Sequence, residues 1–133
     1  MFTKLVSINF FDTDAAGVLF FGNLFRLAHS AYEEFMSNGN FIRNYFLDNE
    51  FAIPIVHTEA NYLKPILPST QLKVELTVEE LKESSFALEY FFVNENHAIL
   101  AKAKTVHVFV SKKEWKKTPI PADVKSYLMK HVS

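Results

Sequence analysis

The segment from Phe11 to Asn23 contains the residue types that acyl-transfer chemistry requires. Asp12 and Asp14 lie two residues apart, Gly17 follows them, and a helical pattern of apolar residues begins near Asn23. The first N–H groups of a helix have no partner within it, so a helix start attracts negative charge. A carboxylate beside such a start indicates attack on a carbonyl whose oxygen becomes an anion.

Hydrophobic patterning predicts the elements that position this segment. Residues 2–10 alternate in polarity, as strands do, whereas apolar residues recur at helical spacing over 23–36, with Gly39 as a left-handed cap. Apolar and polar residues alternate over 72–79, which is the clearest half-buried strand pattern. The remaining predicted elements are a short helix at 41–49, strands at 51–64, 86–93 and 97–111, and a short helix at 121–131.

This order of elements predicts the fold class. A strand, a long helix and then four consecutive strands indicate an α+β fold, in which an antiparallel sheet carries one buried helix on one face. The 133 residues suit a single domain, and 49% hydrophobic residues supply its core. Because fourteen residues are phenylalanine, we also expect some aromatic surface to be buried against another copy of the chain.

The composition excludes several function classes. A formal charge of −1 argues against general nucleic-acid binding, which favours strongly basic chains. The absence of cysteine excludes disulfides, cysteine zinc sites and a thiol nucleophile. The N-terminus lacks a signal-peptide pattern, and no apolar run reaches membrane-spanning length. We therefore expect a soluble cytoplasmic protein that binds neither nucleic acid nor membranes.

Three motifs resemble a known family. The turn Asp12-Thr13-Asp14-Ala15-Ala16-Gly17-Val18, followed by an aromatic pair and a helix, resembles the 4-hydroxybenzoyl-CoA thioesterase family of hotdog folds. The helix sequence His29-Ser30-Ala31-Tyr32-Glu33 is similar to that of the branch that hydrolyses 1,4-dihydroxy-2-naphthoyl-CoA. The segment from Val56 to Pro65 resembles the second strand of that family. Motif order and spacing agree along the whole chain.

The resemblance implies a fold, a site and a reaction. It implies a hotdog fold, in which an antiparallel sheet wraps around one long central helix, and a homodimer or homotetramer with active sites at the subunit interface. It also implies that Asp14 is the catalytic carboxylate and that the backbone N–H of Phe21 stabilises the oxyanion. The substrate would be an acyl-CoA, and no cofactor is expected because CoA is part of the substrate.

The two aspartates have competing structural interpretations. Aspartate favours turns and helix N-caps, so Asp14 is also consistent with a purely structural residue. As a catalytic group it would either attack the thioester carbonyl and form an anhydride or deprotonate a water. For Asp12, a role in accepting backbone N–H groups and shaping the turn is favoured.

Further residues are candidates for substrate binding. Gly17 suits a positive φ or a close ligand approach, and Gly22 would let the acyl or pantetheine group reach the helix start. His29 shares a helix face with Tyr32 and Glu33, so it is either a contact for a polar aryl group or a core histidine. Glu33 is an alternative catalytic carboxylate, and His57 would line the pocket or be a plain strand residue. The five histidines lack metal-site spacing, so no metal is expected.

The leading expectation is hydrolysis of an aromatic acyl-CoA, with 1,4-dihydroxy-2-naphthoyl-CoA first, in menaquinone or phylloquinone synthesis. The branch that hydrolyses 4-hydroxybenzoyl-CoA has an acidic residue where this chain has His29, so that substrate is not transferred. The alternatives are a thioesterase for short or medium aliphatic acyl-CoA or acyl-carrier protein, and a non-catalytic acyl-CoA-binding module. The lysines around Trp115, with Lys64, are candidates for the CoA phosphates or a solvated surface.

Overall fold

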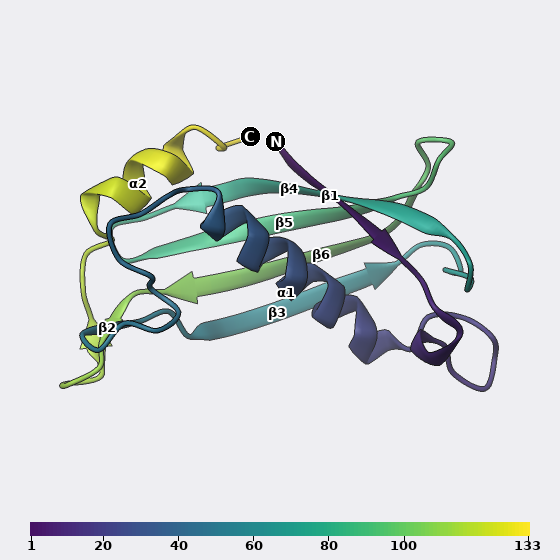
Figure 1. The fold of residues 1–133 in the computed structure, drawn as a ribbon, viewed down its shortest axis with the longest axis horizontal. Helices are drawn as coiled ribbons and strands as arrows, with labels where there is room; N and C mark the ends of the chain where they lie inside the picture. Colours follow the sequence, from purple (N-terminus) through teal and green to yellow (C-terminus); the bar gives the residue numbers. More distant parts are fainter.

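The computed structural model describes residues 1–133 and places one long helix across an antiparallel sheet (Figure 1). The sheet has five strands in the order β1-β4-β5-β6-β3, and every neighbouring pair is antiparallel. This confirms the α+β arrangement. Its strands are β1 (Phe2–Ser7), β3 (Ile55–Tyr62), β4 (Gln71–Leu81), β5 (Ser85–Val93) and β6 (Ile99–Val108).

The remaining elements lie around this sheet. A small sheet joins β2 (Phe51–Ala52), β7 (Val110–Ser111) and β8 (Lys116–Lys117). A 3-10 helix covers Phe10–Asp12, and the long helix α1 covers Phe21–Ser37. The terminal helix α2 (Ala122–Met129) packs against the end of the large sheet near β4 (Figure 1). No helix is both long and apolar enough to cross a lipid bilayer.

The core lies between α1 and the large sheet. The alternation predicted over 72–79 is confirmed, because Leu72, Val74, Leu76 and Val78 are buried along β4 while their charged neighbours face outward. The buried residues of α1 meet this face, as the helical spacing predicted. They are Leu24, Leu27, Ala28, Ala31, Tyr32, Phe35 and Met36.

The helix predicted at 41–49 is wrong. Turns and bends occupy this stretch, because polar side chains hydrogen-bond the local backbone in place of a helix. The Asn44 side chain accepts from the Phe46 N–H at 3.1 Å, and Asp48 accepts from the N–H groups of Glu50 and Phe51 at 2.8 and 2.9 Å. Aspartate and asparagine at these positions therefore favour turns over helix.

Other boundaries differ from the patterns in smaller ways. The first strand ends at Ser7 rather than residue 10, and the strand predicted over 97–111 is interrupted at Phe109, where the chain passes from one sheet to the other. The left-handed residue after α1 is Asn40, with φ 49°, rather than Gly39. Asparagine tolerates this conformation, whereas Gly39 makes room for the Phe41 ring, which a Cβ would hit.

Candidate active site

A tight turn presents Asp14 in front of the start of α1. The Asp14 N–H donates to the Val18 carbonyl at 2.9 Å, and the Gly17 N–H donates to the Asp14 carbonyl at 3.0 Å. Gly17 has φ +78°, which confirms the predicted positive φ. The Leu19 N–H donates to the Ile66 carbonyl at 2.7 Å, so the turn is also fixed to the segment that follows β3.

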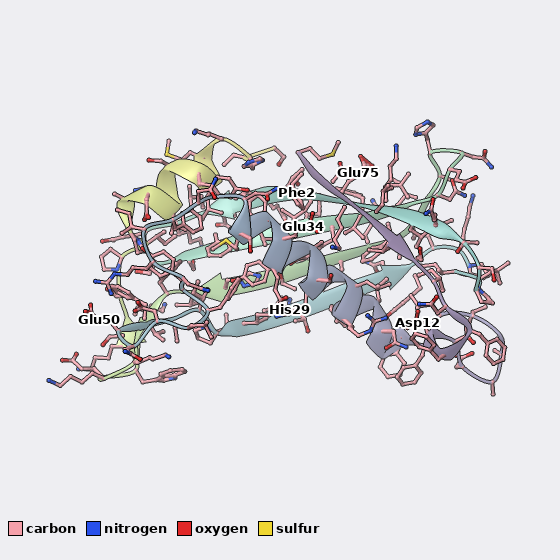
Figure 2. All side chains as sticks on the ribbon, viewed as in Figure 1. Phe2, Asp12, His29, Glu34, Glu50 and Glu75 are labelled. Carbon is pink, nitrogen blue, oxygen red and sulfur yellow. The ribbon has the colours of Figure 1, made fainter.

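The two aspartates of this turn have opposite environments. Asp12 is 2% exposed, and its carboxylate accepts from the Asn9 N–H at 2.9 Å and from the Arg26 guanidinium at 2.7 Å. Figure 2 shows Asp12 beside the start of α1, and the Arg26 contact ties it to this helix. The favoured structural interpretation of Asp12 is thus confirmed.

Asp14 is exposed and has a free carboxylate oxygen. Its Oδ1 accepts from the Ala16 N–H at 2.8 Å, and its Oδ2 makes no hydrogen bond within the chain. One oxygen therefore orients the side chain while the other is available to a substrate or a water. This arrangement suits either a nucleophile or a general base.

The start of α1 leaves two backbone donors unpaired. The N-cap is Phe20, which has no side chain able to cap, and the N–H groups of Phe21 and Gly22 have no acceptor within the chain. Helices usually place serine, threonine, asparagine or aspartate at this position. An apolar N-cap therefore keeps the first N–H groups open for an anionic oxygen. A Cβ on Gly22 would lie 2.9 Å from the Phe20 ring, so glycine here makes room for that ring.

A hollow of about 400 Å³ brings Asp14 and Phe21 together. Its opposite wall is formed by residues 62–66, which include Tyr62 and Lys64. The Tyr62 hydroxyl donates to the Phe21 carbonyl at 2.8 Å and so fixes the helix start against β3. Partial burial raises the pKa of Tyr62, so it stays a neutral donor. No sequence motif singled out Tyr62, because the contact depends on how β3 lies beside α1.

A second hollow, of about 520 Å³, lies farther along α1, between the helix and the sheet. Figure 2 shows His29 on the side of α1 that lies toward β3, and His29 lines this hollow. Its Nε2 is 3.4 Å from the Glu33 carboxylate, which confirms that the two share a helix face. Tyr90 and Thr105 of the sheet form part of the opposite wall.

Tyr32 and His57 line neither of these two hollows. Tyr32 is buried, with its ring 4.3 Å from the His107 ring, and borders a smaller hollow of about 160 Å³ that it shares with His29. His57 is half-exposed on β3, and its Nε2 is 3.7 Å from the Glu59 carboxylate. Their roles in substrate binding stay predictions.

A buried chain of hydrogen bonds crosses the sheet below α1. The Tyr90 hydroxyl is 2.8 Å from Thr105 Oγ1, which is 2.7 Å from His107 Nε2. His107 is fully buried and stacks on the Phe86 ring at 4.9 Å. Burial, with a smaller electrostatic contribution from His29, lowers the pKa of His107 to about 3. Its imidazole is therefore neutral at physiological pH.

This pKa predicts acid destabilisation that originates at one side chain. In the unfolded chain His107 binds a proton below about pH 6.5, but in the folded protein it does so only near pH 3. Stability is therefore complete above pH 6.5 and is lost as the pH falls toward 3. Between pH 7.5 and pH 5, wild type should lose about 2 kcal/mol more unfolding free energy than the His107→Asn variant.

Urea denaturation at the two pH values measures this difference. His97→Asn, in an exposed hairpin, is the matched control and should keep the wild-type loss. Equal pH dependence in wild type and His107→Asn would contradict the assignment.

Charged groups elsewhere form no evident metal site. No group of three or more histidine, aspartate or glutamate side chains is placed to hold a metal ion, and the predicted absence of a metal stays a prediction. The lysine-rich hairpin around Trp115 lies at the same end of the molecule as Glu50, since the Lys112 N–H donates to the Glu50 carbonyl at 2.8 Å. Figure 2 shows Glu50 and Asp12 at opposite ends of the molecule. Lys64, in contrast, lines the Asp14 hollow.

Comparison with known proteins agrees with this fold. The model of the thioesterase-like superfamily matches residues 8–128. A 1,4-dihydroxy-2-naphthoyl-CoA hydrolase from Rippkaea orientalis is 34% identical over 96% of this chain and 93% of its own length. A hydrolase of the same name from Microcystis aeruginosa is 35% identical over 88% of this chain and 85% of its own.

A solved structure is also similar to this chain. The crystal structure of a 1,4-dihydroxy-2-naphthoyl-CoA thioesterase from Synechocystis superimposes with a TM-score of 0.89 at 30% identity, covering 96% of this chain and 95% of the other. The hotdog fold expected from the motifs is confirmed. The chain therefore belongs to the thioesterase-like superfamily.

Proposed function

We propose that this protein is an acyl-CoA thioesterase that hydrolyses an aromatic acyl-CoA, with 1,4-dihydroxy-2-naphthoyl-CoA as its substrate. The observation that carries the reaction type is a hollow lined by both Asp14, which has a free carboxylate oxygen, and Phe21, whose backbone N–H is unpaired. The relatives that share about a third of the sequence support the substrate. We further propose that it acts in the cytoplasm, in menaquinone or phylloquinone synthesis.

The proposed reaction uses these two groups on opposite sides of the thioester. The carbonyl oxygen lies at the Phe21 N–H, which stabilises the negative charge that develops as the carbonyl is attacked. Asp14 either attacks directly, forming an anhydride and expelling the CoA thiolate before water cleaves the anhydride, or takes a proton from the attacking water. In both routes the products are the free acid and CoA.

Hydrolysis of a small ester panel tests this proposal. We expect the highest kcat/KM for 1,4-dihydroxy-2-naphthoyl-CoA, a lower value for benzoyl-CoA and the lowest for hexanoyl-CoA, followed as thiol release. A preference for hexanoyl-CoA would favour the aliphatic thioesterase alternative. Binding of the esters without turnover would favour a non-catalytic module.

The free edge of β3 supports a homodimer with shared sites. β3 pairs only with β6, so its other edge has unpaired backbone groups, and it carries exposed Val56 and Tyr62 but no lysine to block pairing. Antiparallel pairing of this edge with that of a second copy is isologous, so it places the Tyr62 end of one strand opposite the Ile55 end of the other. Each helix start would then lie near the partner's second hollow, which Ile55 lines.

Lysines on this edge should prevent the pairing. We expect the double variant Val56→Lys/His57→Lys to sediment as a monomer and wild type as a dimer or tetramer, because lysines on a strand edge oppose its pairing with another strand. The matched control is Thr3→Lys/Leu5→Lys on β1, the opposite edge of the sheet, which should leave the dimer intact. A dimer that persists in the β3 variant, or a monomeric wild type, would rule out this interface.

A further inference from the structure

The second hollow combines a polar rim with a polar floor. His29 and Glu33 of α1 lie at its rim, and its floor includes Tyr90 and Thr105, which are 1% and 5% exposed. Its volume of about 520 Å³ is within the range of small-molecule sites. Most buried hydroxyl groups have a hydrogen-bond partner inside the protein. The hydrogens of the Tyr90 and Thr105 hydroxyls therefore each need an acceptor, either in the protein or in a ligand.

Counting hydrogens along the Tyr90–Thr105–His107 chain leaves one unused. Two hydroxyls and one neutral imidazole carry three polar hydrogens, whereas the chain contains two hydrogen bonds. His107 Nδ1 is buried among aromatic rings with no partner. If Nδ1 held the proton, it would be a buried N–H without an acceptor, which is rarer than a buried acceptor without a donor.

The other tautomer places the unused hydrogen at the hollow. With its proton on Nε2, His107 donates to Thr105, Thr105 donates to the Tyr90 oxygen, and the Tyr90 O–H remains free to donate to a ligand. The three hydrogen-bonded side chains carry no formal charge, so they suit a neutral oxygen such as a phenolic hydroxyl better than a carboxylate. Thr105 and His107 thereby orient Tyr90 without touching the ligand.

The hollow is also within reach of the reacting centre. Phe21 lines the Asp14 hollow and Phe25 lines the second one, and four helical residues separate them by about 6 Å along the axis of α1. An acyl group whose carbonyl lies at the helix start can therefore extend its ring toward Tyr90.

We propose that the second hollow binds the ring of the acyl group and that Tyr90, positioned by Thr105 and His107, donates a hydrogen bond to a ring hydroxyl. This inference rests on the proposed function. It assigns the selectivity of the enzyme for hydroxylated rings to the floor of the second hollow. A site built to bond a hydroxyl rejects the analogue that lacks it, because its own polar groups then stay unpaired.

Two matched esters and three isosteric variants test this inference. The esters are 1,4-dihydroxy-2-naphthoyl-CoA and 2-naphthoyl-CoA, which differ only in the two ring hydroxyls. Tyr90→Phe should lower kcat/KM for the hydroxylated ester by about tenfold or more and leave the other ester nearly unchanged. Thr105→Val should also lower the ratio of kcat/KM for the hydroxylated ester to kcat/KM for the other ester.

The control removes a tyrosine hydroxyl elsewhere. Tyr127→Phe loses the hydrogen bond to the Phe35 carbonyl, and neither residue lines the hollow, so this variant should keep the wild-type ratio between the esters. Equal losses for both esters in Tyr90→Phe, or no loss for either, would overturn the inference.

A binding measurement separates this inference from the proposed function. Both esters are titrated against the Asp14→Asn variant with and without Tyr90→Phe, and the ratio of their dissociation constants is compared. If wild type hydrolyses neither ester, the proposed function fails, but a hydroxyl preference of about tenfold that Tyr90→Phe abolishes still supports the hollow as the ring site. An unchanged ratio contradicts it.

Discussion

Replacing Asp14 by asparagine should lower kcat for the aromatic acyl-CoA by at least about 100-fold, the loss typical of removing one group that stabilises a transition state. Asparagine keeps the shape of the side chain and its hydrogen bond from the Ala16 N–H, but it is neither a nucleophile nor a base. Because the group acts in the transition state, KM should change little. Thiol release under steady-state conditions measures both constants.

Two further carboxylate variants sharpen this experiment. Glu95→Gln, an exposed change in the β5–β6 hairpin, makes the same chemical replacement away from the site and should keep wild-type activity. Glu33→Gln tests the alternative carboxylate, which lies on α1 in the second hollow. If Glu33→Gln shows the large loss of kcat and Asp14→Asn does not, the assignment of Asp14 as the catalytic carboxylate is wrong.

Replacing Asp12 by alanine should cost about 3 kcal/mol of unfolding free energy, since a buried carboxylate that accepts two hydrogen bonds, one from a charged group, is removed. The change leaves the Asn9 N–H and the Arg26 guanidinium without this acceptor. Asp14→Ala, two residues away, should cost less than about 1 kcal/mol, because Asp14 is exposed and accepts only one local hydrogen bond. Urea denaturation of both variants gives the comparison.

A double-mutant cycle identifies the source of the Asp12 effect. If the loss of unfolding free energy comes from the Asp12–Arg26 ion pair, the double variant Asp12→Ala/Arg26→Ala should lose clearly less than the sum of the losses in the two single variants. Similar losses for Asp12→Ala and Asp14→Ala would mean that the two aspartates do not divide into a structural and an exposed member.

Much of the site was predictable because it is local in sequence. The turn from Asp12 to Val18 and its positive φ at Gly17 lie within seven residues, so residue types and spacing are enough to place them together. The helix itself begins at Phe21, two residues before the apolar pattern indicated. The strand over 72–79 was equally clear, since a period of two residues on a half-buried sheet needs no knowledge of its neighbours.

Other features were missed because they depend on competition between local and helical hydrogen bonds. The stretch 41–49 has a composition that permits a helix, but Asn44 and Asp48 bond to nearby backbone groups instead. Composition alone does not decide which set of bonds forms, because the two differ by little free energy.

The sequence by itself determined the family, the alternation of the strands and the position of Asp14 before an open helix start. Only the tertiary structure placed Tyr62 on the Phe21 carbonyl and connected Tyr90, Thr105 and His107. Within one strand, Thr105 and His107 share a face because they are two residues apart. Their contact with Tyr90 depends on the β5–β6 register, in which Leu88 pairs with Thr105 and Tyr90 with Ala103. Register is set by burial of the whole sheet face, so no single segment encodes it.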